Sequence, residues 1–183
     1  MRSLTLILGG ARSGKSTHAL ALAAAASRVL FVATAEPRDA EMVERIAAHR
    51  HERPVTWDTL EEPRNLAAAI AHGADDYDIV LIDCLTLWVN NMLEAAPDTA
   101  PASWVDSVLA TYRAGRASWI IVSNEVGLGI IPATSLGRAY RDALGTVNRL
   151  VADAADAVTL MVAGLPLIIK GSRGTSNSQP GGR

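Results

Sequence analysis

The 183-residue chain is 49% apolar, which is enough to bury a substantial core, and its length predicts about one domain. Its formal net charge of -2 at pH 7 lacks the basic footprint of a nucleic-acid-binding protein, and its one cysteine, Cys84, excludes a disulfide framework and a thiolate zinc cluster. Because no apolar run reaches the length of a membrane span and no room is left for a cleavable signal peptide, we expect a cytoplasmic protein without a membrane span.

Short apolar runs alternate with helical segments along the chain. Strands are predicted, in chain order, over residues 4–8, 29–33, 79–82, 119–122 and 158–162, and residues 165–169 are a candidate edge strand. Helices are predicted over residues 15–26, 38–51 and 135–155. Most of the strands are uniformly apolar, which is typical of strands covered on both faces. The sequence therefore predicts an α/β fold with a mostly parallel central sheet and helices on both faces.

Four loops are predicted to meet at one edge of this sheet. Right-handed crossovers place the carboxyl ends of parallel strands at the same edge, where ligands of such sheets bind. The loops are residues 9–16, the turn after Ala33, the turn after Asp83 and residues 123–129. We expect residues 1–170 to form a single nucleotide-binding catalytic domain. Residues 171–183 lack apolar anchors and are predicted to be a disordered tail.

The loop after the first strand matches the P-loop pattern at every required position, through Gly9, Gly10, Ala11, Arg12, Ser13, Gly14, Lys15 and Ser16. Its backbone N–H groups and the N-terminus of the following helix form a cradle for phosphates. Lys15 supplies a positive charge for the β and γ oxygens, and the Ser16 hydroxyl suits a Mg²⁺ that bridges them. The complete pattern favours a nucleotide site over a chance glycine-rich turn, and it specifies the fold as a three-layer P-loop NTPase type.

Asp83 ends the apolar run of residues 79–82, where an acidic partner of the P-loop is expected. From there a carboxylate reaches the Mg²⁺ or its waters. The alternative is that Asp83 caps the N-terminus of the helix that follows Thr86. Both roles remain open from the sequence, and metal contact is the preferred one.

Four histidines are candidate acceptors of a phosphoryl or nucleotidyl group. His18 follows the P-loop on its helix, and His72 suits the C-terminus of an alanine-rich helix. Spacing alone favours a solvated helical C-terminus for both His49 and His51. A signalling GTPase is disfavoured, because residues 124–127 lack the Lys and Asp of the guanine-binding motif.

Several further segments, taken with the P-loop, resemble one enzyme family closely. They are Ala33-Thr34-Ala35, residues 41–50 with Glu41-Met42, Arg45-Ile46 and His49-Arg50, residues 124–132, Arg141-Asp142, Gly145, Asn148 and Ala155-Asp156. The chain resembles adenosylcobinamide kinase/adenosylcobinamide-phosphate guanylyltransferase over nearly everything before the tail. This resemblance implies phosphorylation of adenosylcobinamide with ATP or GTP, transfer of GMP from GTP to the phosphate, and a homo-oligomer.

The resemblance also assigns residues to these reactions. It implies that His49 is the histidine that becomes guanylylated, with Lys15 as the second catalytic residue. Some members carry another histidine just before this position, where this chain has Ala48. The implied nucleotide contacts, beside the P-loop, are Ala33, Thr34, Ala35, Arg50, His51, Glu52, Arg53, Glu61 and Asp83. Glu61 lies in an acidic run that, judged by spacing alone, is a solvated face.

Two alternative functions fit the P-loop without the resemblance. A P-loop kinase of another small alcohol uses the same cradle but has no need of His49. A nucleotide-dependent binding or assembly module uses the triphosphate only to order its loops. Substrate panels separate the first alternative from the cobinamide enzyme, and turnover counts against the second.

Overall fold

The computed structural model describes residues 2–51 and 53–171 of the chain. Its strands form one seven-stranded sheet in the order β3-β2-β4-β5-β1-β6-β7 within these residues. The strands are β1 (Leu4–Gly9), β2 (Val29–Ala33), β3 (Asp58–Glu61), β4 (Ile79–Asp83), β5 (Ser118–Val122), β6 (Ala157–Val162) and β7 (Leu165–Lys170). All neighbouring strands pair in parallel except β7, which runs antiparallel to β6. This confirms the predicted, mostly parallel sheet.

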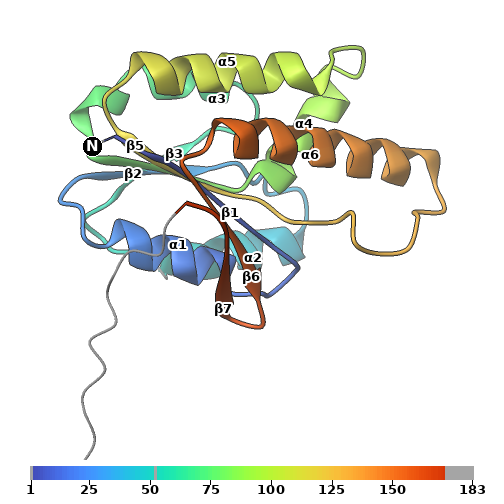
Figure 1. Ribbon diagram of the computed structural model, residues 1–183, viewed down its shortest axis with the longest axis horizontal. Helices are drawn as coiled ribbons and strands as arrows, with labels where there is room; N and C mark the ends of the chain where they lie inside the picture. Colours follow the sequence, from blue (N-terminus) through green and yellow to red (C-terminus); the bar gives the residue numbers. More distant parts are fainter. Residues whose placement is uncertain (1, 52, 172–183) are drawn as a thin grey trace, which may run out of the picture.

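Helices cover both faces of the sheet (Figure 1). The helical elements are α1 (Lys15–Ala23), α2 (Ala40–His51), α3 (Leu66–Ala71), the short 3-10 turn η1 (Ala74–Asp76), α4 (Leu85–Ala95), α5 (Pro101–Ala114) and α6 (Ser135–Ala154). In Figure 1, α1 and α2 lie below the sheet, while α3 to α6 lie above it. The predicted three-layer arrangement is therefore present.

The residues on each face of the sheet pack in a separate hydrophobic cluster. Adjacent residues of a strand point to opposite faces, so Leu6 packs in the cluster that includes Leu144 and Val147 of α6. Its neighbour Ile7 packs instead with Ala19 of α1. Strands buried on both sides must be apolar throughout, which is why the sequence pattern identified them.

The structure differs from the predicted elements at β3, at several helix ends and in α5, a helix that was not predicted. The strand β3 was not predicted, because Asp58–Glu61 is largely polar and exposed. The candidate edge strand is present as β7. Helix α1 ends three residues earlier than predicted, and α2 begins two residues later. Apart from Gly171, the predicted tail lies outside the described residues, and no helix among the described residues is long and apolar enough to cross a membrane.

Candidate functional site

The carboxyl ends of five parallel strands meet at one edge of the sheet. In the strand register Asp83 of β4 lies between Ala33 of β2 and Val122 of β5, and Ala33 also pairs with Glu61 of β3. The P-loop leaves β1 at the same edge. A cavity of about 630 Å³ opens there and is lined from these strand ends, the P-loop and α2. The predicted convergence of loops is thus found around a single hollow.

The P-loop backbone requires glycine where the chain turns. A Cβ on Gly9 would lie 2.6 Å from the carbonyl oxygen of Met161, and Gly14 has a φ of +89°. Arg12, between them, also has a positive φ of 54°. A loop with such turns can aim several backbone N–H groups into one concavity, which suits an anion. Residues 11–16 line the cavity, while Gly9 and Gly10 form the turn that leads into it.

Lys15 opens helix α1 and lies on the wall of the cavity. Lys15 is 8% exposed, and its ammonium nitrogen donates a hydrogen bond of 2.6 Å to the carbonyl oxygen of Gly10. The side chain therefore folds back over the loop that it serves. The positive end of the α1 dipole adds to its charge at this point.

Asp83 lies at the centre of the charged groups of the cavity. Burial raises the pKa of its carboxyl above the ordinary value. The hydrogen bond from the Ser16 hydroxyl and the electrostatic effects of His49, Arg53 and Lys15 act in the opposite direction, but burial is the larger effect. Two cationic side chains and one histidine, from α1, α2 and the loop after α2, thus lie close to one carboxylate.

The oxygens of Ser16 and Asp83 suit a Mg²⁺ ion. The ion prefers oxygen ligands, and in nucleotide sites it takes one or two from the protein and others from phosphates. The described residues contain no cluster of three or more His, Cys, Asp or Glu that could hold a metal without such phosphates. Helix α4 is capped by Cys84 without a side-chain hydrogen bond, so the alternative role of Asp83 as a helix cap has no support.

His49 lies in the last turn of α2 and lines the cavity. His51 is exposed, and its Nδ1 lies 2.7 Å from the carbonyl oxygen of Ala47. His51 does not line the cavity, whereas His49 is close enough to Asp83 to influence its ionisation. The two histidines, which spacing could not distinguish, therefore have different surroundings.

Arginines and one glutamate line the β3 end of the cavity. Arg50 of α2 forms an ion pair with Glu61, which ends β3. The guanidinium of Arg53 lies over the Phe31 ring, 3.7 Å from its centroid. A second hollow of about 600 Å³ shares these two arginines and Glu61 with the first, and it extends to Trp57. Glu52, also predicted as a contact, lies outside the described residues.

Thr34 occupies a different position from its neighbours Ala33 and Ala35. Both alanines line the cavity, but Thr34 is fully buried. Its hydroxyl donates to the carbonyl oxygen of Cys84 at 2.7 Å and accepts from the Cys84 N–H at 3.1 Å. Asn91 in turn donates to the Thr34 carbonyl at 3.0 Å. The Thr34 side chain therefore joins the ends of β2 and β4.

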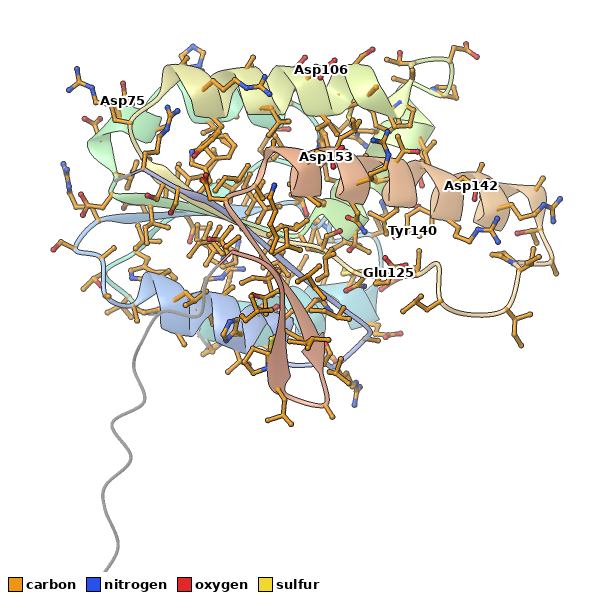
Figure 2. All side chains as sticks on the ribbon, viewed as in Figure 1. Asp75, Asp106, Glu125, Tyr140, Asp142 and Asp153 are labelled. Atoms are coloured by element: carbon orange, nitrogen blue, oxygen red, sulfur yellow. The ribbon has the colours of Figure 1, made fainter. Side chains whose placement is uncertain are left out.

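Sequence reasoning named no site residue from α4 or from the loop after β5. Thr86 and Asn124 line the cavity, and the Asn124 N–H donates to the Thr86 hydroxyl at 2.9 Å. The placement of residues 123–129 at the sheet edge was the available signal for Asn124. Figure 2 shows Glu125 at the start of this loop and Tyr140 on α6 nearby. The Tyr140 hydroxyl donates to the Thr86 carbonyl at 3.3 Å, and burial raises its pKa to about 12.

Among solved structures, the chain resembles a prototypical ATPase from the type III secretion system of pathogenic bacteria. The match covers 86% of this chain and 50% of the ATPase, with a TM-score of 0.50 at 16% identity. The chain thus spans about half the length of that protein. At this identity the likeness concerns the fold alone, and it agrees with a P-loop NTPase-type sheet.

Sequence comparisons identify much closer relatives. The "Bifunctional adenosylcobalamin biosynthesis protein CobP" of Pseudomonas aeruginosa is 44% identical over 167 residues, covering 91% of this chain and 96% of the relative. The "Bifunctional adenosylcobalamin biosynthesis protein CobU" of Escherichia coli is 38% identical over 180 residues, covering 91% and 99%. The family model described as "Cobinamide kinase / cobinamide phosphate guanyltransferase" matches residues 5–169, from β1 to β7. The chain therefore belongs to the cobinamide kinase / cobinamide phosphate guanyltransferase family.

Proposed function

We propose that this chain phosphorylates adenosylcobinamide with ATP or GTP and then transfers GMP from GTP to the new phosphate, giving adenosyl-GDP-cobinamide. One observation carries the proposal: the P-loop with Lys15 and the helix end with His49 line the same cavity around Asp83. A phosphate cradle and a nucleophile at one cavity suit two reactions of one nucleotide. Membership of the family supports the pairing of a kinase with a guanylyltransferase.

In the kinase reaction the P-loop N–H groups and Lys15 bind the β and γ phosphates. Ser16 and Asp83 would hold a Mg²⁺ ion, which would supply neutralisation of charge on these phosphates. The chain's own groups then contribute position and positive charge, which is most of what phosphoryl transfer requires. Loss of Lys15 is expected to weaken both reactions, because both use the same phosphate cradle.

In the guanylyl transfer a ring nitrogen of His49 attacks the α-phosphorus of GTP. A P–N bond forms as the bond to the bridging oxygen breaks, and pyrophosphate leaves with the electron pair toward Lys15. An oxygen of cobinamide phosphate then attacks the same phosphorus and releases the histidine. Two displacements avoid bringing two highly charged anions together in one step.

Nucleotide contacts beyond the P-loop are assigned to the β3 end of the cavity. Arg50, Arg53 and Glu61 line it, and their charges suit phosphate oxygens and the hydrogen-bonding groups of a ribose or base. Ala33 and Ala35 allow the nucleotide to approach the ends of the strands. The contribution of Thr34 is structural support from behind this wall, through its hydrogen bonds to Cys84. His51 and Glu52 remain predicted contacts.

We also infer a homo-oligomer in the cytoplasm. Support for association comes from strand β7, an edge strand on which Leu165, Leu167 and Ile169 are 71%, 51% and 60% exposed. Edge strands with exposed apolar side chains are suited to pairing with another chain.

Product analysis tests the proposed function. The purified protein is incubated with ATP or GTP, Mg²⁺ and either adenosylcobinamide or a panel of small alcohols, and products are identified by mass. We expect cobinamide phosphate, followed by GDP-cobinamide only when GTP is present. Phosphorylation of another alcohol but not cobinamide would support a different kinase, and nucleotide binding without turnover would support an assembly module.

A further inference from the structure

We propose that Asn124 is a further catalytic residue, whose carboxamide contacts the transferred γ-phosphoryl group and the acceptor hydroxyl in the kinase reaction. The proposal rests on the proposed function, which supplies a nucleoside triphosphate and an alcohol. It concerns a part of the cavity that the predicted site residues do not include, namely the end of β5.

The sheet order places Asn124 beside the phosphate cradle. Strand β5 lies between β1, which carries the P-loop, and β4, which carries Asp83. Neighbouring strands are about 4.8 Å apart. Asn124 follows β5 by two residues and lines the cavity. Its neighbour Glu125 donates its N–H to the carbonyl oxygen of Gly9 at 3.1 Å, so this loop lies beside the P-loop, which would hold a γ-phosphate.

Side chains from two helices hold the Asn124 backbone. Its N–H donates to the Thr86 hydroxyl of α4 at 2.9 Å. Its carbonyl oxygen accepts from Nδ2 of Asn148 at 2.9 Å, and Asn148 is a buried residue of α6. The Asn124 carboxamide has no hydrogen bond to another group in the described part of the chain. The backbone is thus fixed from behind, and the side chain is left for a ligand.

The chemistry of a carboxamide fits both groups that meet at this point. Its NH₂ donates to a γ-phosphoryl oxygen, while its oxygen accepts from the O–H of the alcohol. Because it is neutral, it does not repel the phosphates. Among the described residues, the two carboxylates that line the cavity are already engaged, Asp83 with Ser16 and Glu61 with Arg50. Asn124 is therefore the group suited to orient the hydroxyl.

The step that Asn124 serves is a single displacement. The hydroxyl oxygen forms a bond to the γ-phosphorus as the bond from that phosphorus to the β,γ-bridging oxygen breaks. The nucleoside diphosphate leaves with the electron pair. The hydroxyl proton passes late to a nonbridging oxygen of the transferred group, so the step needs orientation rather than a strong base.

Asn124 and His49 enter the cavity from different elements. Asn124 follows β5, whereas His49 lies in the last turn of α2, the helix after β2. The two residues therefore belong to separate walls of the cavity. In the proposed reactions Asn124 acts on the γ-phosphorus and His49 acts at the α-phosphorus. Substitution of Asn124 should separate the two reactions.

The test measures both reactions in Asn124→Ala. Phosphoryl transfer from γ-labelled ATP to cobinamide reports the kinase, and label from α-labelled GTP on the protein, without cobinamide, reports guanylylation. We expect the kinase kcat to fall about 100-fold, as for loss of one preorganised hydrogen bond in a transition state. The label on the protein should stay at the wild-type level. Asn90→Ala is the matched control, because the Asn90 side chain donates instead to Glu94 on α4.

Other outcomes would overturn the proposal. An unchanged kinase kcat in Asn124→Ala excludes the role, and so does an equal loss of both reactions at an unchanged thermal midpoint. If Asn124→Ala is poorly folded, Asn124→Leu, which is neutral and of similar size, must show the same separation. A wild type that phosphorylates a different alcohol contradicts the proposed function only, and the same measurement then uses that alcohol. A wild type that is guanylylated but phosphorylates no alcohol contradicts the Asn124 assignment.

Discussion

Asp83 is a buried carboxylate whose ionised form is useful to the site but unfavourable to the fold. Its surroundings contain a hydroxyl from Ser16, the imidazole of His49 and the cationic groups of Lys15 and Arg53, yet burial still raises its pKa. The native state therefore binds a proton more readily than the unfolded chain. The stability that this provides is lost as the pH rises through the native pKa, so an ionised Asp83 lowers the stability at neutral pH.

Asp83→Asn is accordingly expected to raise the thermal midpoint of the nucleotide-free protein at pH 7. The same substitution should remove most of the additional stabilisation by GTP and Mg²⁺, because binding to the native state supplies that stabilisation. Thermal unfolding with and without GTP and Mg²⁺ measures both effects. Asp78→Asn is the control, because a hydrogen bond from the Arg28 backbone lowers the pKa of the Asp78 carboxyl. This variant should lose a little stability, and its thermal midpoint should still rise with GTP and Mg²⁺ as in the wild type. A lower midpoint for nucleotide-free Asp83→Asn would contradict the prediction.

Site residues could be predicted from the sequence when their signal was local. The P-loop is contiguous, and Asp83 follows directly from an apolar run. The position of Arg53 over Phe31 joins residues of different elements, so no local pattern reveals it. Thr34 was predicted as a nucleotide contact from the resemblance, while its hydroxyl is engaged by Cys84. The role of Asn124 could not be predicted in the same way, because it depends on the strand order, which places β5 between β1 and β4.

At the scale of elements, the turn from β1 into α1 depends on close packing against β6. A Cβ on Gly9 would lie 2.5 Å from the Ser13 hydroxyl and 2.6 Å from the Met161 carbonyl oxygen. A Cβ on Gly10 would meet no atom within 4 Å. The two adjacent glycines of one loop therefore have different steric requirements.

Gly9→Ala should destabilise the protein by about 1–3 kcal/mol, as overpacking does, and should abolish nucleotide binding by distorting the cradle. Gly10→Ala is the matched control and should keep the wild-type thermal midpoint. Thermal unfolding and binding of a fluorescent GTP analogue provide the measurements. Equal effects of the two substitutions would show that the contact with Met161 is unimportant.

Elements were predicted from the sequence where burial determines composition. The central strands are apolar because helices cover both faces, and all of them were found. Strand β3 lies at the edge of the sheet, and most of its residues are exposed. Its sequence, Asp58–Glu61, therefore looks like a solvated acidic segment rather than a strand. Its position is set by pairing with β2, which a local pattern does not contain.

For the whole molecule, β7 leads to a prediction about assembly. Leu165 and Leu167 alternate along the regular part of the strand and therefore share one face, while Ile169 lies at an irregularity in the pairing with β6. Leu167→Glu should shift the protein toward the monomer in sedimentation equilibrium, because it places a charge within this apolar face. Leu22→Glu, at an exposed position of α1, is the control. A monomeric wild type would show that the predicted oligomer is wrong.

The central claim for the molecule is that one cavity serves two reactions, with His49 as the GMP acceptor. Mass spectrometry of the GTP-treated protein, first intact and then after proteolysis, tests it most directly. The wild type and His51→Ala should gain the mass of one GMP less one water on the peptide that contains His49, and His49→Ala should gain nothing. An adduct on another residue, or a wild type without an adduct during GMP transfer to cobinamide phosphate, would contradict it.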